Sequence, residues 1–272
     1  MAESTITRGS ITFKAYMTTG PLSSDKGTCE TITQLHRWTD KLITFRTTRP
    51  ENYAFTPGQY ARLGLPDGDS LVWRAYSITS TPGEETLEFY GIVVEGGQFT
   101  GKLDLLKVGD AIWVDRQVFG FMTESRFADG DDLWMLATGT GVGPFISILR
   151  EKALWQRWRH LVLVHCVRHP DELAYSDELA AMAKADGSGK LRLLRLVTRD
   201  ATGSHLQGRI TTLLQNGVLE QAAGLPLDVQ HSRVMLCGNP AMIEETRKLL
   251  HERGMRPVRR MNPGQFVTEN YW

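Results

Sequence analysis

Polar and apolar residues alternate over short segments in the first half of the chain, and this period of two is typical of half-buried β-strands. The segment LITFRT at 42–47 is the clearest case, because it is rich in β-branched residues. Turns containing Pro-Gly, Gly-Gly and Gly-Asp pairs separate it from similar segments. The predicted strands are 42–47, 59–65, 73–79, 86–94 and 111–114. Short strands at this spacing predict a small antiparallel β-barrel.

The second half shows continuous apolar runs, which are typical of parallel strands buried on both faces. These runs are 133–137, 161–166, 191–197 and 234–237. Helical patterns lie between and after them, at 144–150 onward, 171–185, 210–215 and 240–253. Strands that alternate with helices predict a doubly wound α/β domain with a parallel sheet.

A length of 272 residues favours two domains, and the polar stretch 128–132 is the expected boundary. We expect an N-terminal extension at 1–27, a β-barrel domain at 28–128 and an α/β domain at 129–272. The extension is rich in Ser, Thr and Gly and weakly periodic, which is typical of a loosely packed or disordered end.

Charge and composition exclude several classes of protein. Lys plus Arg and Asp plus Glu both number 31, so net charge does not favour binding to nucleic acid or to a membrane surface. No apolar run approaches the ~20 residues that span a bilayer, and no signal-peptide pattern opens the chain. We therefore expect a cytoplasmic protein, and the zero net charge is compatible with a monomer. The three cysteines, Cys29, Cys166 and Cys237, are too scattered for a disulfide framework, a zinc site or an iron–sulfur cluster.

The segment TGTGVGP at 138–144 follows a predicted strand and precedes a predicted helix. Glycines let a backbone approach a pyrophosphate closely, and Pro144 suits the start of a helix. The glycine spacing differs from the Rossmann G-x-G-x-x-G pattern. A tight strand-to-helix turn would also require glycine, but the context favours phosphate binding. The candidate residues are Gly139, Thr140, Gly141, Gly143 and Pro144.

The segment RAYS at 74–77 places a cation and an aromatic ring on one face of a predicted strand, since Arg74 and Tyr76 are two residues apart. Such a pair could hold a phosphate and stack on a planar ring. Taken alone, the segment favours a surface strand with mixed residues.

Two further features lie at the expected carboxyl edge of the parallel sheet, where open α/β sheets bind ligands. CGNP at 237–240 ends one strand, and Cys237 there is either a small core residue or part of a site with Gly238 and Asn239. Arg168, Arg199 and Arg209 follow other strands or turns, and arginine binds phosphate in bidentate fashion.

The motifs RAYS at 74–77, ATGTGVGP at 137–144 and CGNP at 237–240, with the terminal Tyr271-Trp272, together resemble the plant-type ferredoxin/flavodoxin–NADP reductases, most closely their bacterial branch. The resemblance runs from about residue 28 to 272. It implies an FAD-dependent enzyme that transfers a hydride between NADPH and the flavin N5 and single electrons to or from ferredoxin or flavodoxin.

The same resemblance implies an FAD site in the barrel. Arg74 would contact the pyrophosphate, Tyr76 would stack on the isoalloxazine, and Ser77 would lie beside N5. A second flavin segment is GQFT at 97–100, in which Thr100 would cap a helix N-terminus facing the phosphates. Further residues of the implied cofactor site are Ala75, Tyr90, Gly97, Phe99 and Thr140.

The implied NADP(H) site uses the glycine-rich loop and the arginines. Arg199 and Arg209 match positions that hold the 2′-phosphate, while Arg168 would lie near the ribose or phosphates. Asp200 weakens the expectation of a strict NADPH preference. Cys237 would lie under the nicotinamide.

The chain end would complete the implied catalytic set, which consists of Ser77, Cys237 and Glu269. Glu269 matches an acidic position beside the hydride path, Tyr271 would cover the flavin, and Trp272 would stack on the adenine. Trp272 departs from the plant pattern, which ends on the flavin-stacking aromatic.

Alternatives within and outside this class remain open. One is an NAD(P)H-dependent flavoprotein reductase that serves an oxygenase or another electron-transfer chain. Another is a flavin-binding sensor module without turnover, for which the hydride-path residues would be superfluous. Since ferredoxins and flavodoxins are acidic, we expect a basic docking surface, although such charges usually form an ordinary solvated face. The candidate cations are Arg37, Lys41, Arg46, Arg49, Arg256, Arg259 and Arg260.

Overall fold

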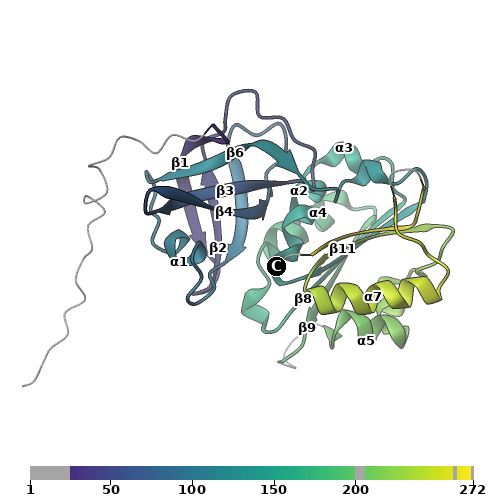
Figure 1. Ribbon diagram of the computed structural model, residues 1–272. Coiled ribbons are helices and arrows are strands. Elements are labelled where there is room, and N and C mark those ends of the chain that lie inside the picture. Colours follow the sequence, from purple (N-terminus) through teal and green to yellow (C-terminus); the bar gives the residue numbers. More distant parts are fainter. Residues whose placement is uncertain (1–24, 200–205, 260–261, 271–272) are drawn as a thin grey trace, which may run out of the picture.

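The computed structural model describes residues 25–199, 206–259 and 262–270 of the chain. Two lobes lie side by side (Figure 1), a β-barrel from the first half of the sequence and an α/β layer structure from the second. The predicted fold class is therefore confirmed. Among these residues, no helix has the length and apolar character needed to cross a membrane.

The barrel is a six-stranded antiparallel sheet in the order β4-β3-β6-β1-β2-β5. A bridge between Ile78 and Phe89 links the two edges of the sheet. Its apolar interior includes Ile32, Phe45 and Leu63, all fully buried. The strands are β1 (Gly27–Arg37), β2 (Leu42–Thr47), β3 (Tyr60–Asp67), β4 (Ser70–Ser77), β5 (Leu87–Ile92) and β6 (Ala111–Phe119).

Strand β1 was not among the predicted strands, although each predicted strand of this half is present. Its sequence GTCETITQLHR is mostly polar, and only Gly27, Glu30 and Ile32 are buried. A strand with so few apolar residues gives almost no alternating hydrophobic signal, and pairing with β2 and β6 determines its conformation.

The second lobe contains a six-stranded parallel sheet in the order β10-β9-β8-β7-β11-β12, with helices on both faces (Figure 1). Its strands are β7 (Asp132–Thr138), β8 (His160–Val167), β9 (Leu191–Val197), β10 (Leu206–Gln207), β11 (Ser232–Gly238) and β12 (Phe266–Asn270). Its helices are α2 (Gly143–Arg150), α3 (Lys152–Trp155), α4 (Ser176–Asp186), α5 (Ile210–Gln215), α6 (Val218–Ala223) and α7 (Pro240–Glu252).

Strand β7 shows why the apolar runs are continuous. Leu133 and Met135 pack into the core beneath α2 and α4, whereas Trp134 and Leu136 pack into the core beneath α5 and α7. Because successive side chains point to opposite faces, a strand covered by helices on both sides needs apolar residues at every position. The sequence order also reverses at β7, which lies between β8 and β11.

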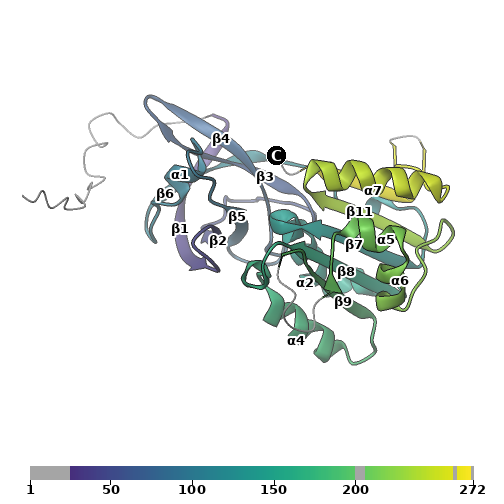
Figure 2. The same cartoon turned by 90° about the horizontal axis from the view of Figure 1, so that it is seen from below.

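Two elements differ from the predicted pattern. The helix expected at 171–185 is divided: a short 3-10 helix at Pro170–Glu172 precedes α4, and Tyr175 between them has a left-handed φ of 61°. The edge strand β12, which pairs with β11, was not among the predicted strands. Strand β12 ends where the two lobes meet (Figure 2). Tyr271 and Trp272 lie outside the described residues.

Candidate functional site

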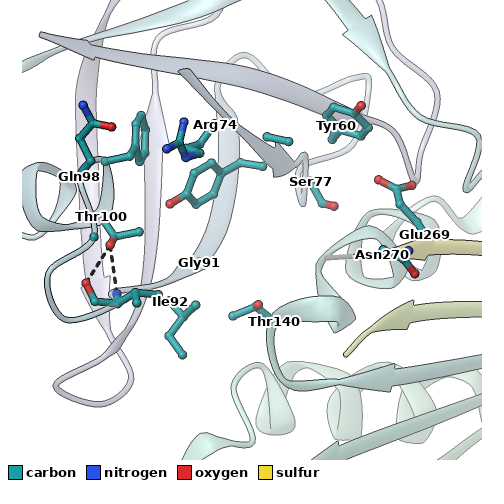
Figure 3. A pocket seen from close by; sticks show the side chains of 15 residues that line it. Tyr60, Arg74, Ser77, Gly91, Ile92, Gln98, Thr100, Thr140, Glu269 and Asn270 are labelled. Carbon is teal, nitrogen blue, oxygen red and sulfur yellow. Dashed lines mark hydrogen bonds between the residues drawn. The ribbon is translucent and has the colours of Figure 1, made fainter. Parts of the chain in front are cut away.

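A cavity of about 520 Å³ opens on the barrel at the junction of the lobes (Figure 3). Strand β4 and the turn before α1 (Thr100–Leu103) both line this cavity. Residues of the predicted flavin site line this cavity: Arg74, Ala75, Tyr76, Ser77, Gly97, Phe99, Thr100, Thr140 and Glu269. The structure therefore brings together segments separated by almost 200 residues.

The Tyr76 ring rests on the backbone of Gly91 in strand β5. A Cβ on Gly91 would overlap Cε1 of the ring, so the close approach requires glycine at this position. The Phe99 ring lies 5.5 Å from the Tyr76 ring, and burial raises the pKa of the Tyr76 phenol. Packing on both sides therefore holds the Tyr76 ring in place, and Arg74, two residues earlier on the same strand, is exposed.

Thr100 does not cap the N-terminus of α1, contrary to the sequence expectation. The N-cap residue is Phe99, and the helix has only four residues. The Thr100 hydroxyl instead donates to the Val94 carbonyl at 3.0 Å and accepts from the Val94 amide at 3.1 Å (Figure 3). A Cβ on Gly97 would collide with this hydroxyl. Thr100 thus closes the turn that forms the cavity wall.

Glu269 and Ser77 face the cavity from different lobes (Figure 3). Burial raises the pKa of Glu269 from 4.5 to about 7, so this carboxyl can gain or lose a proton near neutral pH. Cys237 pairs with Glu269 in the β11–β12 register, but its side chain is fully buried. Burial, and secondarily the Glu269 charge, raises the pKa of the Cys237 thiol. Cys237 lines neither this cavity nor the next one, and its position under a nicotinamide stays a prediction.

A second cavity, of about 700 Å³, lies at the carboxyl ends of the parallel strands. Predicted nucleotide-site residues that line it are Gly139, Thr140, Arg168, Arg199, Arg209 and Asn239. Gly141, Gly143, Pro144 and Gly238 do not line the cavity. A Cβ on Gly141 would lie 2.5 Å from the Cys237 carbonyl oxygen, so the loop packs directly on the end of β11.

Buried polar groups hold the glycine-rich loop in place. His165 of β8 lies 3.0 Å from the Gly139 carbonyl oxygen through Nε2. Burial lowers the pKa of His165 to about 4, so the ring is neutral and donates its Nε2 proton to that carbonyl. On the other side, the backbone N–H of Asn239 donates to Thr138 Oγ1 at 2.8 Å. The Asn239 side chain in turn caps α7.

The three arginines of the second cavity differ in their partners. The Arg168 guanidinium is paired with Glu172 at 2.6 Å, and the Arg168 amide also donates to that carboxylate. Arg199 and Arg209 are exposed and have no carboxylate partner in the part of the chain that the structure describes. They are therefore the cations that can bind an added anion. Asp200 lies outside the described residues.

The two cavities share a wall made by Thr140 and Ile92. Thr140 is 1% exposed, and its hydroxyl oxygen has no hydrogen-bond partner among the described residues. A buried hydroxyl without a partner is unfavourable, which indicates that a ligand atom or water satisfies it.

One predicted cofactor residue lies outside both cavities, and some residues that line the barrel cavity were not predicted. Tyr90 is fully buried, packs edge-on against Tyr175 and lines neither cavity. It lies in the core between the lobes because its side chain points to the opposite face of β5 from Gly91. Tyr60 and Asn270 were missed as cavity residues. The pairing of Tyr60 with Ser77 across β3 and β4 could have indicated the first of these.

The family comparisons agree with both cavities. Residues 26–116 match the model described as an oxidoreductase FAD-binding domain, and residues 135–248 match the oxidoreductase NAD-binding domain. The chain is similar to ferredoxin–NADP reductase A of Sorangium cellulosum, with 38% identity over 247 residues and 88% of each chain covered. It is also similar to the flavodoxin/ferredoxin–NADP reductase of Escherichia coli, with 39% identity over 242 residues, 89% of this chain and 97% of the relative.

A solved structure of a ferredoxin–NADP⁺ reductase from Neisseria gonorrhoeae, with bound FAD and NADP, resembles this fold with a TM-score of 0.87. The sequences are 38% identical, and the match covers 92% of this chain and all of that one. The identity over nearly the whole length confirms the resemblance seen in the motifs. The chain belongs to the ferredoxin/flavodoxin–NADP reductase family.

Proposed function

We propose that this protein is an FAD-dependent reductase that carries electrons between NADPH and a small acidic carrier, ferredoxin or flavodoxin. The observation that supports it most is the shared wall: Thr140 and Ile92 line both the barrel cavity and the sheet-edge cavity. Two planar ligands that fill these cavities meet at this wall. Near-attack contact between their rings is what hydride transfer needs.

The residues of the barrel cavity fit an FAD. Tyr76 offers an aromatic face, exposed Arg74 offers a cation for a phosphate, and Thr140 offers a buried hydroxyl that needs a partner. FAD, when bound, supplies the exchange between two-electron hydride chemistry and one-electron transfer. We assign the FAD domain to 28–128 and the NADP domain to 129–272.

The sheet-edge cavity fits NADP(H). Arg199 and Arg209 would bind the 2′-phosphate, and the loop at 139–143 would approach the pyrophosphate. Arg168 is committed to Glu172 and so contributes less to phosphate binding.

The chain's own contribution at the reacting centre comes from Ser77 and Glu269. Both face the barrel cavity beside the shared wall. With a pKa near 7, Glu269 can hold or release a proton there, whereas the Cys237 thiol stays protonated in the core. We infer that Cys237 acts as a small, packed support beneath the glycine-rich loop and the nicotinamide position.

Three of the cations expected to form the docking surface already have partners, whereas exposed Lys41 stays a candidate. Arg37 is paired with Asp104, Arg46 with Glu84 and Glu88, and Arg49 donates to backbone carbonyls. Arg256 and Arg259 precede β12, so they lie toward the amino ends of the parallel strands, whereas the cavities lie at the carboxyl ends. Arg260 lies outside the described residues.

We place carrier docking at an aromatic and basic cluster beside the barrel cavity. Arg62 lies over the Phe119 ring at 4.3 Å, and Arg126 lies over the Phe121 ring at 5.4 Å. Phe121 is 75% exposed, and Phe119 stacks on the cavity residue Tyr60. Arg62 and Arg126 have no carboxylate partner within the described ranges, so they can attract an acidic carrier. Arg62→Ala together with Arg126→Ala should slow carrier reduction at low salt and leave NADPH oxidation with a small artificial acceptor unchanged.

The first test is the absorption spectrum of the purified protein, followed by anaerobic NADPH and then NADH. Flavin bands that bleach faster with NADPH support the proposal, and transfer to flavodoxin or ferredoxin then identifies the acceptor. Equal bleaching by NADH favours a broader NAD(P)H-linked reductase, FAD without bleaching favours a binding module, and failure to bind FAD refutes the proposal. The monomeric state and cytoplasmic location stay predictions, to be tested by light scattering and cell fractionation.

A further inference from the structure

A charged cluster joins the two lobes at a third and smaller cavity, of about 250 Å³, which is lined by Glu88, Arg150 and Tyr175. Its centre is Glu88 of β5, which is 4% exposed. One oxygen of this carboxylate accepts from Arg150 Nη1 at 2.7 Å and from Thr79 Oγ1 at 2.9 Å. The other oxygen lies 2.6 Å from Arg46 Nη2. The Arg150 and Arg46 guanidinium groups hold the pKa of Glu88 below its usual range despite its burial, so the carboxylate is charged.

Arg150 connects this barrel carboxylate to a second carboxylate in the other lobe. It is the last residue of α2, and its Nε and Nη2 donate to the two oxygens of Glu178 in α4 at 2.6 and 2.9 Å. This bidentate pair lies within the α/β lobe and fixes the orientation of the Arg150 guanidinium. The Nη1 atom of the same guanidinium donates across the interface to Glu88 and, at 2.9 Å, to the Thr79 carbonyl oxygen. The cluster therefore restricts how the barrel can rotate or slide on the α/β layer.

Tyr175 provides a second connection between the lobes. Its hydroxyl donates to Glu88 at 3.1 Å and lies 2.8 Å from Thr44 Oγ1 of β2. Trp38 Nε1 donates to the same Thr44 oxygen. Tyr175 is buried and adopts a left-handed φ of 61°, a sparsely populated conformation for a bulky residue. The backbone thus has an unfavourable conformation at the residue whose hydroxyl enters the cluster.

The cluster lies at the far ends of the two elements that lead to the shared wall. Within strand β5, Glu88 lies four residues before Ile92, which is a rise of about 13 Å along the strand. Helix α2 runs back from Arg150 to Gly143, about 10 Å, and Gly143 is three residues after Thr140. Ile92 and Thr140 are the residues common to both cavities. At its middle, α2 is tied to the barrel again, since Ser147 Oγ donates to the Ser80 carbonyl at 2.7 Å.

We propose that Glu88, Arg150 and Tyr175 are positioning residues that set the placement of the barrel cavity relative to the sheet-edge cavity, and so the alignment of the two bound rings. This inference rests on the proposed function. The three residues line the third cavity, and none of them lines the barrel cavity or the sheet-edge cavity. They act through β5 and α2, the two elements that lead to the shared wall. An apolar contact between the lobes would exclude water equally well, but it would not orient its partners as directional hydrogen bonds do.

The test compares Glu88→Gln and the milder Tyr175→Phe with a matched control, Glu220→Gln. Glu220 pairs with Arg253 at 2.8 Å inside the α/β lobe and lines neither cavity. For each FAD-loaded protein we would measure FAD affinity, affinity for 2′-phospho-AMP, the flavin bleaching rate at saturating NADPH, and the temperature dependence of its isotope effect with deuterated NADPH. Hydrogen exchange of the β5 and α2 backbone amides, measured without nicotinamide, shows whether the charged cluster restrains these two elements, and it does so independently of activity.

A positioning role predicts that Glu88→Gln slows bleaching about tenfold or more and makes the isotope effect more temperature-dependent. Both affinities should stay within about twofold of wild type, because each cavity is lined by other residues. Tyr175→Phe should give a smaller change of the same kind, and both variants should exchange faster at β5 and α2. Glu220→Gln should change none of these quantities.

A folded Glu88→Gln protein with wild-type bleaching and an unchanged isotope effect would overturn the inference. A loss of FAD affinity in proportion to the rate would also overturn it, since the cluster would then support one cavity only. If even the wild-type protein is not bleached by NADPH, the proposed function fails. In that case, unchanged hydrogen exchange in both variants would by itself refute the idea that the charged cluster restrains β5 and α2.

Discussion

Arg209→Ala should convert the protein from a reductase that prefers NADPH toward one that accepts both nicotinamide cofactors. Arg209 is exposed, lines the sheet-edge cavity and has no carboxylate partner among the described residues. Its guanidinium is therefore available for the 2′-phosphate, the only group that distinguishes NADPH from NADH. Because the Arg209 side chain makes no hydrogen bond to any residue that the structure describes, its removal should change the free energy of unfolding by less than about 0.5 kcal/mol.

The size of the effect follows from the kind of contact that is lost. A hydrogen bond to a charged group contributes about 1.5–3 kcal/mol, and each 1.36 kcal/mol is a factor of ten. The substitution should lower kcat/KM for NADPH by roughly 10- to 150-fold. Solvent around this exposed site screens the charges, so we expect the lower part of that range. The value for NADH should stay within about twofold, since it carries no 2′-phosphate.

The assay is steady-state oxidation of NADPH and NADH with an artificial acceptor, at fixed ionic strength. Arg168→Ala is the matched control, because Arg168 lines the same cavity but is paired with Glu172. It should change the NADPH-to-NADH ratio much less than Arg209→Ala does. An unchanged ratio in Arg209→Ala would refute the assignment of Arg209. If Arg168→Ala lowered the NADPH-to-NADH ratio of kcat/KM as much as Arg209→Ala does, pairing with Glu172 would not make Arg168 less important for phosphate binding.

Three further predictions concern the reacting centre. Because burial raises the pKa of Glu269 from 4.5 to about 7, the folded state holds this proton more tightly than the unfolded chain. The contribution of Glu269 to the free energy of unfolding should therefore fall by about 3 kcal/mol as pH rises through this window. Urea titrations of FAD-free protein at about pH 5 and pH 8 should show this fall as the difference between wild type and Glu269→Gln. Gly141→Ala, whose Cβ would meet the Cys237 carbonyl, should destabilise by roughly 1–3 kcal/mol in thermal melts. Gly83→Ala should cost less, because its Cβ meets nothing within 4 Å and its φ is not in the left-handed region. Cys237→Ala should slow hydride transfer in stopped-flow experiments more than it weakens FAD retention, and an unchanged rate would count against its supporting role.

The elements with strong local signals were predicted correctly. Strands β2 and β9 have the bounds that periodicity indicated, and α5 and α7 agree to within one residue. Strands β1 and β12 were missed because their sequences contain few apolar residues, and neighbouring strands supply their pairing. The split before α4 was missed because nothing in the local pattern predicts a left-handed Tyr175. Its hydroxyl contacts are with the other lobe.

The sequence by itself determined the family, the two lobes and the edge of the sheet where nucleotide-binding residues gather, because periodicity and turn residues act over short distances. Only the tertiary structure decided which of those residues meet. It placed Tyr90 in the core, enclosed the Cys237 thiol, paired Arg168 with Glu172 and made Thr140 and Ile92 the common wall. Those outcomes depend on how the barrel packs against the parallel sheet, and contacts between residues far apart in the chain leave no periodic signal in either half.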